Sequence, residues 1–188
     1  PPIPFAQEKK MNIFYLHHDP KINAQYHVDK HIVKMCIEYA QLLSTAHRLL
    51  DGNIYTDKTK NNRNIKRWNL EDHRECLLYK ASHINHPSNI WARQSTENYK
   101  YLFLMYISCL QEYTHRYGKI HGSQKLEFIL STPPNNIKSL GITPIPQCMP
   151  EYCKIANDSI SAYRKYYISE KNTFAYWTNR TKPDWYNI

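Results

Sequence analysis

Apolar residues recur along most of this chain at steps of three or four positions, which is the period of an amphipathic α-helix. The longest run predicts a helix from residue 22 or 23 to Leu50, ended by the glycine of Asp51-Gly52-Asn53. A second long run predicts a helix over residues 96–117, which Gly118 ends. Shorter helices are predicted near residues 69–78, 123–130 and 157–168.

Two polar segments interrupt the helical pattern. Residues 51–70 combine many asparagines with basic residues, which favours either a phosphate-contacting loop or a disordered insertion. Residues 131–150 hold five prolines and Gly141, which predicts an irregular loop within the domain. The sequence therefore predicts an all-α fold, a single compact helical domain with long irregular loops. The basic residues of the first segment are Lys58, Lys60, Arg63, Lys66 and Arg67.

A chain of 188 residues is long enough for one domain with its own core. The pattern Met11-Asn12-Ile13-Phe14 resembles a natural start. We therefore expect residues 1–10 to be a leader or an added segment, and residues 11–188 to form the single helical domain.

The charge balance favours a polyanionic partner. The formal net charge is +9, with 25 Lys and Arg against 16 Asp and Glu, and nucleic acid is a better candidate than an anionic membrane. The chain also has 16 Tyr, 4 Trp and 5 Phe, and aromatic rings beside cations suit unstacked or flipped bases. A basic protein without such a partner would carry the same charge, so the charge alone leaves both interpretations open.

Cysteine usage and the absence of standard motifs exclude several classes. The five cysteines include no C-x-x-C pair, which indicates reduced, buried thiols in an intracellular protein and argues against a disulfide framework or a zinc ribbon. No apolar run is long enough to span a membrane. Dinucleotide-binding, P-loop, serine-hydrolase and H-E-x-x-H motifs are also missing. We expect a monomer that needs no cofactor.

One stripe of the first predicted helix is polar at every step. A solvated helix surface produces the same pattern, but this stripe concentrates two histidines, one carboxylate and two cations in register. We therefore favour a functional surface. Its members are His27, His31, Lys34, Glu38, Gln41, Thr45 and Arg48.

Glu38 is the only carboxylate on this stripe, and Lys34 lies four residues before it. A carboxylate in a basic, partly desolvated site can stabilise an oxocarbenium-like state or move protons during glycosidic-bond cleavage. The alternative is an ordinary surface ion pair with Lys34, which contributes only about 0.3–0.5 kcal/mol.

The histidines support a different hypothesis. His27 and His31 are spaced i, i+4, so both rings can face one metal ion, although this spacing is also common among hydrogen-bonded histidines. With Asp29, His83 and His86 they would form the site of a metal-dependent phosphohydrolase or nuclease. A non-catalytic nucleic-acid-binding protein is the third possibility.

Three blocks resemble one known family. Asp29-Lys30-His31-Ile32-Val33 is followed by Glu38, Asn98–Leu102 leads through Glu112 to Arg116-Tyr117-Gly118, and the tail is Lys182-Pro183-Asp184-Trp185-Tyr186. In this order and spacing the chain resembles the pyrimidine-dimer DNA glycosylases, the endonuclease V family of bacteriophages and algal viruses. It departs from them beside the glutamate, where the family's Arg is Ile37 and its Pro-Arg is Ala40-Gln41.

The resemblance implies a compact helical protein that binds damaged duplex DNA, bends it and flips out a base. In the family the N-terminal α-amine attacks the sugar to form an imine, a glutamate assists, and β-elimination cuts the strand. Carried over, Glu38 takes the glutamate's role, His31 the helix histidine's, and Met11 or Asn12 the amine's. Lys30 or Lys34 would substitute if no α-amine were available.

The expected DNA contacts combine cations with neighbouring polar and aromatic residues. Phosphate contacts of this kind make affinity strongly dependent on salt. The residues are Gln41, Arg48, Arg93, Lys100, Arg116, Lys182, Trp185 and Tyr186.

Overall fold

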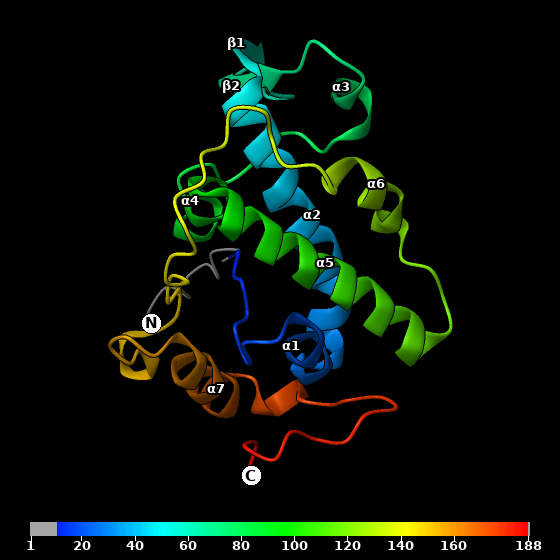
Figure 1. Ribbon diagram of the computed structural model, residues 1–188, viewed down its shortest axis with the longest axis vertical. Helices are drawn as coiled ribbons and strands as arrows, with labels where there is room; N and C mark the ends of the chain where they lie inside the picture. Colours follow the sequence, from blue (N-terminus) through cyan, green and yellow to red (C-terminus); the bar gives the residue numbers. More distant parts are fainter. Residues whose placement is uncertain (1–10, 188) are drawn as a thin grey trace.

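A computed structural model describes residues 11–187 (Figure 1). The chain is 51% helical, and within these residues it forms seven α-helices and one two-stranded sheet. The prediction of a mostly helical fold is confirmed, but the fold is not purely α. The elements are α1 (Pro20–Tyr26), α2 (Asp29–Asp51), β1 (Asn53–Lys58), β2 (Asn64–Asn69), α3 (Arg74–Leu77), α4 (Pro87–Gln94), α5 (Thr96–Tyr117), η1 (Gly122–Leu126), α6 (Glu127–Leu130), η2 (Glu151–Cys153), α7 (Ser159–Glu170) and η3 (Asn172–Phe174).

The core forms where α5 crosses α2, with α1 and α4 packed against this pair (Figure 1). The predicted apolar stripe of α2 is buried as expected, with Ile32, Tyr39 and Leu43 fully inaccessible to solvent. Much of the opposite polar stripe is buried too, including Thr45 and Arg48. The central helix is therefore covered on several sides, and the polar stripe is not a single exposed surface.

The first predicted helix is wrong in one respect, because it is divided at His27 and Val28. Both residues are extended, with ψ of 133° and 156°. The backbone N–H of Asp29, at the start of α2, donates to the carbonyl of Tyr176 in the C-terminal tail at 2.9 Å. The apolar period continues through this break, so the pattern of hydrophobicity could not reveal it.

The second long helix has the predicted bounds. The Ser95 side chain accepts from the Asn98 amide and begins α5, and Gly118 ends it in the left-handed region at φ 62°. The proline-rich segment that follows α6 is irregular, as predicted, and Asn98 exchanges hydrogen bonds with Thr143 within it. The predicted helix over 123–130 is η1 followed by α6, and the one over 157–168 is α7.

Residues 51–70 form neither a loop nor a disordered insertion. Instead β1 and β2 pair antiparallel from Asn53↔Asn69 to Lys58↔Asn64, at the end of the molecule that the C-terminus of α2 reaches (Figure 1). A five-residue turn connects them, with Asn62 at φ 57°. Because β2 extends to Asn69, the helix predicted near 69–78 is reduced to the four residues of α3.

All five cysteines are free thiols. Cys36, Cys109 and Cys153 are buried, as expected, whereas Cys76 is exposed and Cys148 is partly exposed.

Within residues 11–187, none of the helices combines the length and the apolar character that crossing a membrane requires.

Candidate functional site

The first half of α2 presents Lys30, His31, Lys34 and Glu38 at spacings that place them on neighbouring turns of one side. The Lys34 Nζ lies 3.3 Å from the Glu38 Oε1, with the lysine side chain 51% exposed and the glutamate only 15% exposed. The carboxylate is therefore largely removed from water, unlike the glutamate of an ordinary surface pair.

His31 is held among aromatic rings. Phe14 stacks on it with 4.0 Å between ring centroids, and Phe174 meets it edge-on at 5.9 Å. Burial, the largest effect, lowers its pKa well below the usual value, and electrostatic interactions with His27, Lys171 and Lys34 lower it further. His31 is consequently neutral at physiological pH.

His31 is hydrogen-bonded to a tyrosine of α7. The Tyr167 hydroxyl lies 2.6 Å from His31 Nδ1 and also accepts a hydrogen bond from the Val28 backbone N–H. The hydroxyl therefore bridges the His31 ring and the backbone at the start of α2. His31 is therefore a neutral ring that a buried tyrosine holds in place.

A third lysine joins this group from the end of α7. The Lys171 Nζ lies 4.6 Å from the centre of the Tyr166 ring, and the Lys30 Nζ lies 4.6 Å from that of Phe174. We call Lys30, His31, Lys34, Glu38 and Lys171 the α2–α7 cluster. Sequence reasoning missed Lys171 and its aromatic neighbours, and the tyrosine-rich stretch 163–167 was the only signal for them.

The segment that carries Met11 and Asn12 packs beside this cluster. Phe14 stacks on the His31 ring, and its backbone N–H donates to the Tyr39 hydroxyl at 3.2 Å. Both Met11 and Asn12 are buried, with exposures of 4% and 2%. The expected leader, residues 1–10, lies outside the described residues.

A buried hydrogen-bond chain fixes this segment. His27 Nδ1 donates to the Asn23 carbonyl at 2.7 Å, and its Nε2 accepts from the Tyr39 hydroxyl at 2.9 Å. Burial, the largest effect, lowers the pKa of His27 to about 4. Asn23 Oδ1 also accepts from the Leu16 amide. The neutral histidine therefore ties α1, α2 and the N-terminal segment together.

The alternative metal site is not assembled. Both ring nitrogens of His27 are used in these hydrogen bonds, and Asp29 binds Arg116 and Thr178. The His86 ring accepts from the Ser88 amide as the cap of α4. Across the part of the chain that the structure describes, no three His, Cys, Asp or Glu side chains are grouped to hold a metal ion.

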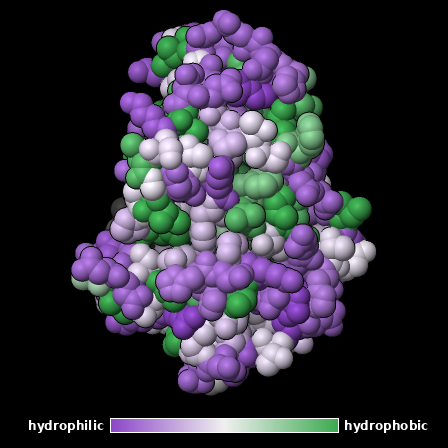
Figure 2. All heavy atoms as spheres, in the orientation of Figure 1, coloured by the Kyte–Doolittle hydropathy of each residue, from purple (hydrophilic) through white to green (hydrophobic). Residues whose placement is uncertain are grey.

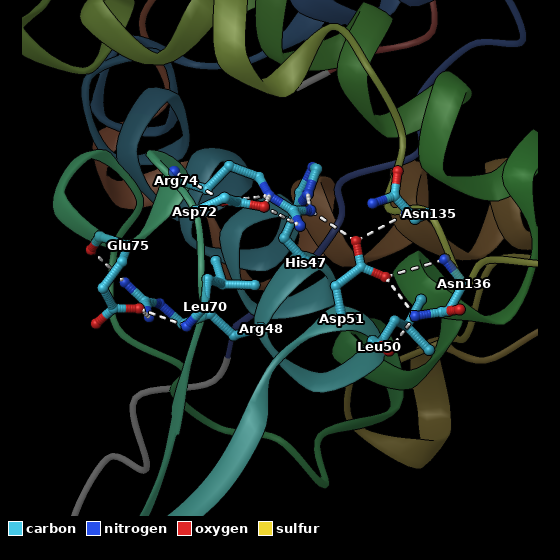
Figure 3. Close-up of polar contacts among 10 residues, drawn as sticks. All are labelled: His47, Arg48, Leu50, Asp51, Leu70, Asp72, Arg74, Glu75, Asn135 and Asn136. Atoms are coloured by element: carbon cyan, nitrogen blue, oxygen red, sulfur yellow. Dashed lines mark hydrogen bonds and ion pairs between the residues drawn. The ribbon is translucent and has the colours of Figure 1, made fainter.

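Arg48 was expected to contact DNA, and this is wrong because its side chain is only 3% exposed. All five of its N–H groups donate hydrogen bonds inside the protein. The acceptors are the Glu75 carboxylate and the backbone carbonyls of Trp68, Glu75, Leu78 and Tyr79. Figure 3 shows its ion pair with Glu75. Arg48 holds the hairpin and the α3 region to α2.

Arg116 was also expected to contact DNA, and its side chain is fully buried. It binds Glu112, Asp29 and the Gln25 carbonyl, and Arg180 binds the same Glu112. Burial alone would raise the pKa of Glu112, but the hydrogen bonds from the two arginines outweigh it and lower the pKa. This ion network fastens the C-terminal tail to the helices.

The other expected contacts are divided between surface and interior. Lys100 and Lys182 are exposed, whereas Tyr186 is buried. The remaining three, Gln41, Arg93 and Trp185, are partly buried. Trp185 packs under the Arg164 guanidinium, and Arg93 donates to the Ile84 carbonyl. A cavity of about 470 Å³ beside the tail is lined by Arg180, Lys182, Asn172, Ala175 and the rings of Tyr176, Trp177 and Tyr186.

Comparison with protein-family models, with curated proteins and with solved structures finds no match for this chain.

Proposed function

We propose that this protein is a DNA repair glycosylase with associated abasic-site lyase activity, which acts on pyrimidine dimers in duplex DNA through an imine. The observation that carries the proposal is the largely buried Glu38 carboxylate, which pairs with Lys34 on the side of α2 that also carries the neutral His31. A carboxylate in such surroundings is suited to stabilising positive charge on a sugar as a glycosidic bond breaks.

The chemistry needs an amine as well as the carboxylate. The amine nitrogen bonds to the sugar C1′, the bond from C1′ to the base breaks, and the base leaves with a proton. Ring opening gives an imine, and loss of a C2′ proton then expels the 3′ phosphate by β-elimination. Glu38 would stabilise the first step and accept the C2′ proton, while a terminal amine near Met11, or Lys34 or Lys30, would form the imine.

Borohydride trapping tests the proposal, because borohydride reduces an imine to a stable covalent link. The protein would be mixed, in EDTA, with a duplex that contains one cyclobutane pyrimidine dimer. We expect a covalent protein–DNA adduct, reduced at least tenfold in Glu38→Gln. The same assay on Lys30→Gln, on Lys34→Gln and on a chain that begins at Met11 would identify the amine. Loss of the adduct in one lysine variant would assign the imine to that lysine, and a gain of adduct in the shortened chain would assign it to the terminal amine.

The matched control is Glu127→Gln, which makes the same change at an exposed position on α6 and should leave trapping unchanged. No adduct with any chain, although DNA is bound, would contradict the enzymatic proposal and leave a non-catalytic nucleic-acid-binding protein. An activity abolished by EDTA would instead favour the metal-dependent alternative.

A further inference from the structure

The β1–β2 hairpin has two different faces. Side chains of a strand alternate, so Ile54, Thr56, Lys58, Asn64, Lys66 and Trp68 share one face. All of these except Trp68 are exposed, whereas on the other face Asp57, Ile65 and Arg67 are partly buried, and Asn53 and Tyr55 are exposed. The Arg67 Nη1 lies 3.5 Å from the Ala81 carbonyl, so this second face is directed at the body of the protein.

Charge is concentrated on the outer face and on the turn. Lys58 and Lys66 lie on the outer face, and Lys60 and Arg63 lie in the turn, all four exposed. The one acidic residue of the hairpin, Asp57, belongs to the inner face. Figure 2 shows this end of the molecule as mostly hydrophilic. The outer face has cations and no carboxylate of its own.

The base of the hairpin is fixed in place. Arg48 Nη1 donates to the Trp68 carbonyl at 2.9 Å, and Asn53 Nδ2 donates to the Glu71 carboxylate at 2.7 Å. At the tip, the Thr59 amide donates to the Arg63 carbonyl, and Thr59 Oγ1 accepts from the Arg63 amide. Little ordering is needed for a partner to meet this surface, so binding would not be weakened by a large loss of chain entropy.

We propose that the outer face of the hairpin binds the phosphate backbone of duplex DNA, with the ribbon lying in the major groove. The inference rests on the proposed function and adds a docking element to it. Strands lie about 4.8 Å apart, so a two-stranded ribbon fits a groove about 12 Å wide. The four cations are then placed beside the phosphates at the edges of the groove. A membrane fits less well, because the turn Thr59–Arg63 has no apolar side chain to insert.

The salt dependence of binding tests this inference on the full chain. Affinity for an undamaged duplex of about 25 base pairs would be measured by fluorescence anisotropy over a range of NaCl concentrations. In the variant Lys58, Lys60, Arg63 and Lys66→Gln, we expect the slope of log K against log salt to fall by about three. The Kd at 0.1 M salt should rise about a hundredfold.

The matched control removes the same charge elsewhere, through Lys119, Lys125, Lys138 and Lys165→Gln, all of which are exposed. Its slope should change by less than one. Equal losses in both variants would overturn the inference, because net charge alone would then explain the binding. Thermal unfolding of both variants should match the parent, and a selective loss of stability in the hairpin variant would also overturn it, since the side chains would then have a structural role.

Two more measurements separate this inference from the proposed function and from a membrane partner. Glu38→Gln should keep the parent's salt slope, and the hairpin variant should still form the borohydride adduct at saturating protein. An adduct together with an unchanged hairpin slope would refute only the hairpin inference. Hairpin-dependent DNA binding without any adduct would refute only the glycosylase. Hairpin-dependent binding to phosphatidylserine vesicles, with unchanged DNA affinity, would overturn the DNA assignment.

Discussion

Lowering the pH from 7.5 to 5 should reduce the free energy of unfolding by about 4 kcal/mol, from His27 and His47 together. Both side chains are buried, and burial, the largest effect in each case, lowers the pKa of each to about 4. In the unfolded chain each titrates near 6.5. The unfolded state therefore binds more protons between these two values, and stability falls as the pH is lowered through that window.

Each neutral ring has a defined hydrogen-bonding role, which gives the loss its structural cause. Arg74 Nη1 lies 2.9 Å from His47 Nδ1 (Figure 3), so that nitrogen must accept, and protonation would place two donors against each other. The neutral His27 Nε2 accepts from the Tyr39 hydroxyl, and protonation of that nitrogen would break this hydrogen bond. His31, whose pKa is also lowered by burial, adds to the loss in the same direction.

Urea unfolding at pH 7.5, 6.5, 5.5 and 5 measures this effect. His47→Gln should flatten the dependence by about 2 kcal/mol over that range, although it lowers stability at pH 7.5. His73→Gln, at an exposed position, is the matched control and should leave the slope unchanged. The pKa values of Asp51, Asp72 and Glu75 are lowered in the folded protein. The stability that these carboxylates contribute is lost mainly below about pH 4.5, so it affects the profile from 7.5 to 5 little. A flat profile from 7.5 to 5 would contradict the prediction.

Local signals explain what the sequence could predict. The helix over 96–117 follows from its apolar period and from Gly118, both of which are properties of neighbouring residues. The hairpin was missed because its strands lack a glycine-containing turn, although Ile54, Tyr55 and Thr56 are good strand formers. The break before α2 depends on contacts with the tail about 150 residues away in sequence, which no local pattern contains.

The candidate site divides in the same way. The pairing of Lys34 with Glu38 follows from helix spacing alone, and the two side chains form an ion pair in the structure. The position of Lys171, and the hydrogen bond from Tyr167 to His31 across 136 residues, depend on how α7 packs. The polar stripe was misread for a related reason, because a pattern of polarity cannot show that the N–H groups of Arg48 find partners inside the protein.

The replacement Arg48→Lys should destabilise the protein by about 3–5 kcal/mol, although it keeps the charge. The arginine donates to four carbonyls and to the Glu75 carboxylate, whereas an ammonium group has three N–H donors in a compact head. At least two of the five acceptors would lose this partner, at about 1–3 kcal/mol for each one that is buried. Arg63→Lys, at the exposed turn, is the matched control and should change stability by less than about 0.5 kcal/mol.

Urea unfolding gives the loss of stability, and amide hydrogen exchange locates it. Because Arg48 binds the Trp68 carbonyl, exchange should accelerate first in β2 and α3. The same variant separates the structural role from a role in binding DNA. If Arg48 were a phosphate contact, lysine would largely preserve both stability and affinity, since either cation can meet a phosphate. A loss of stability below about 1 kcal/mol would therefore refute the role of Arg48 as the anchor of the hairpin. It would also refute the rigid base that the hairpin needs to present its cations to DNA.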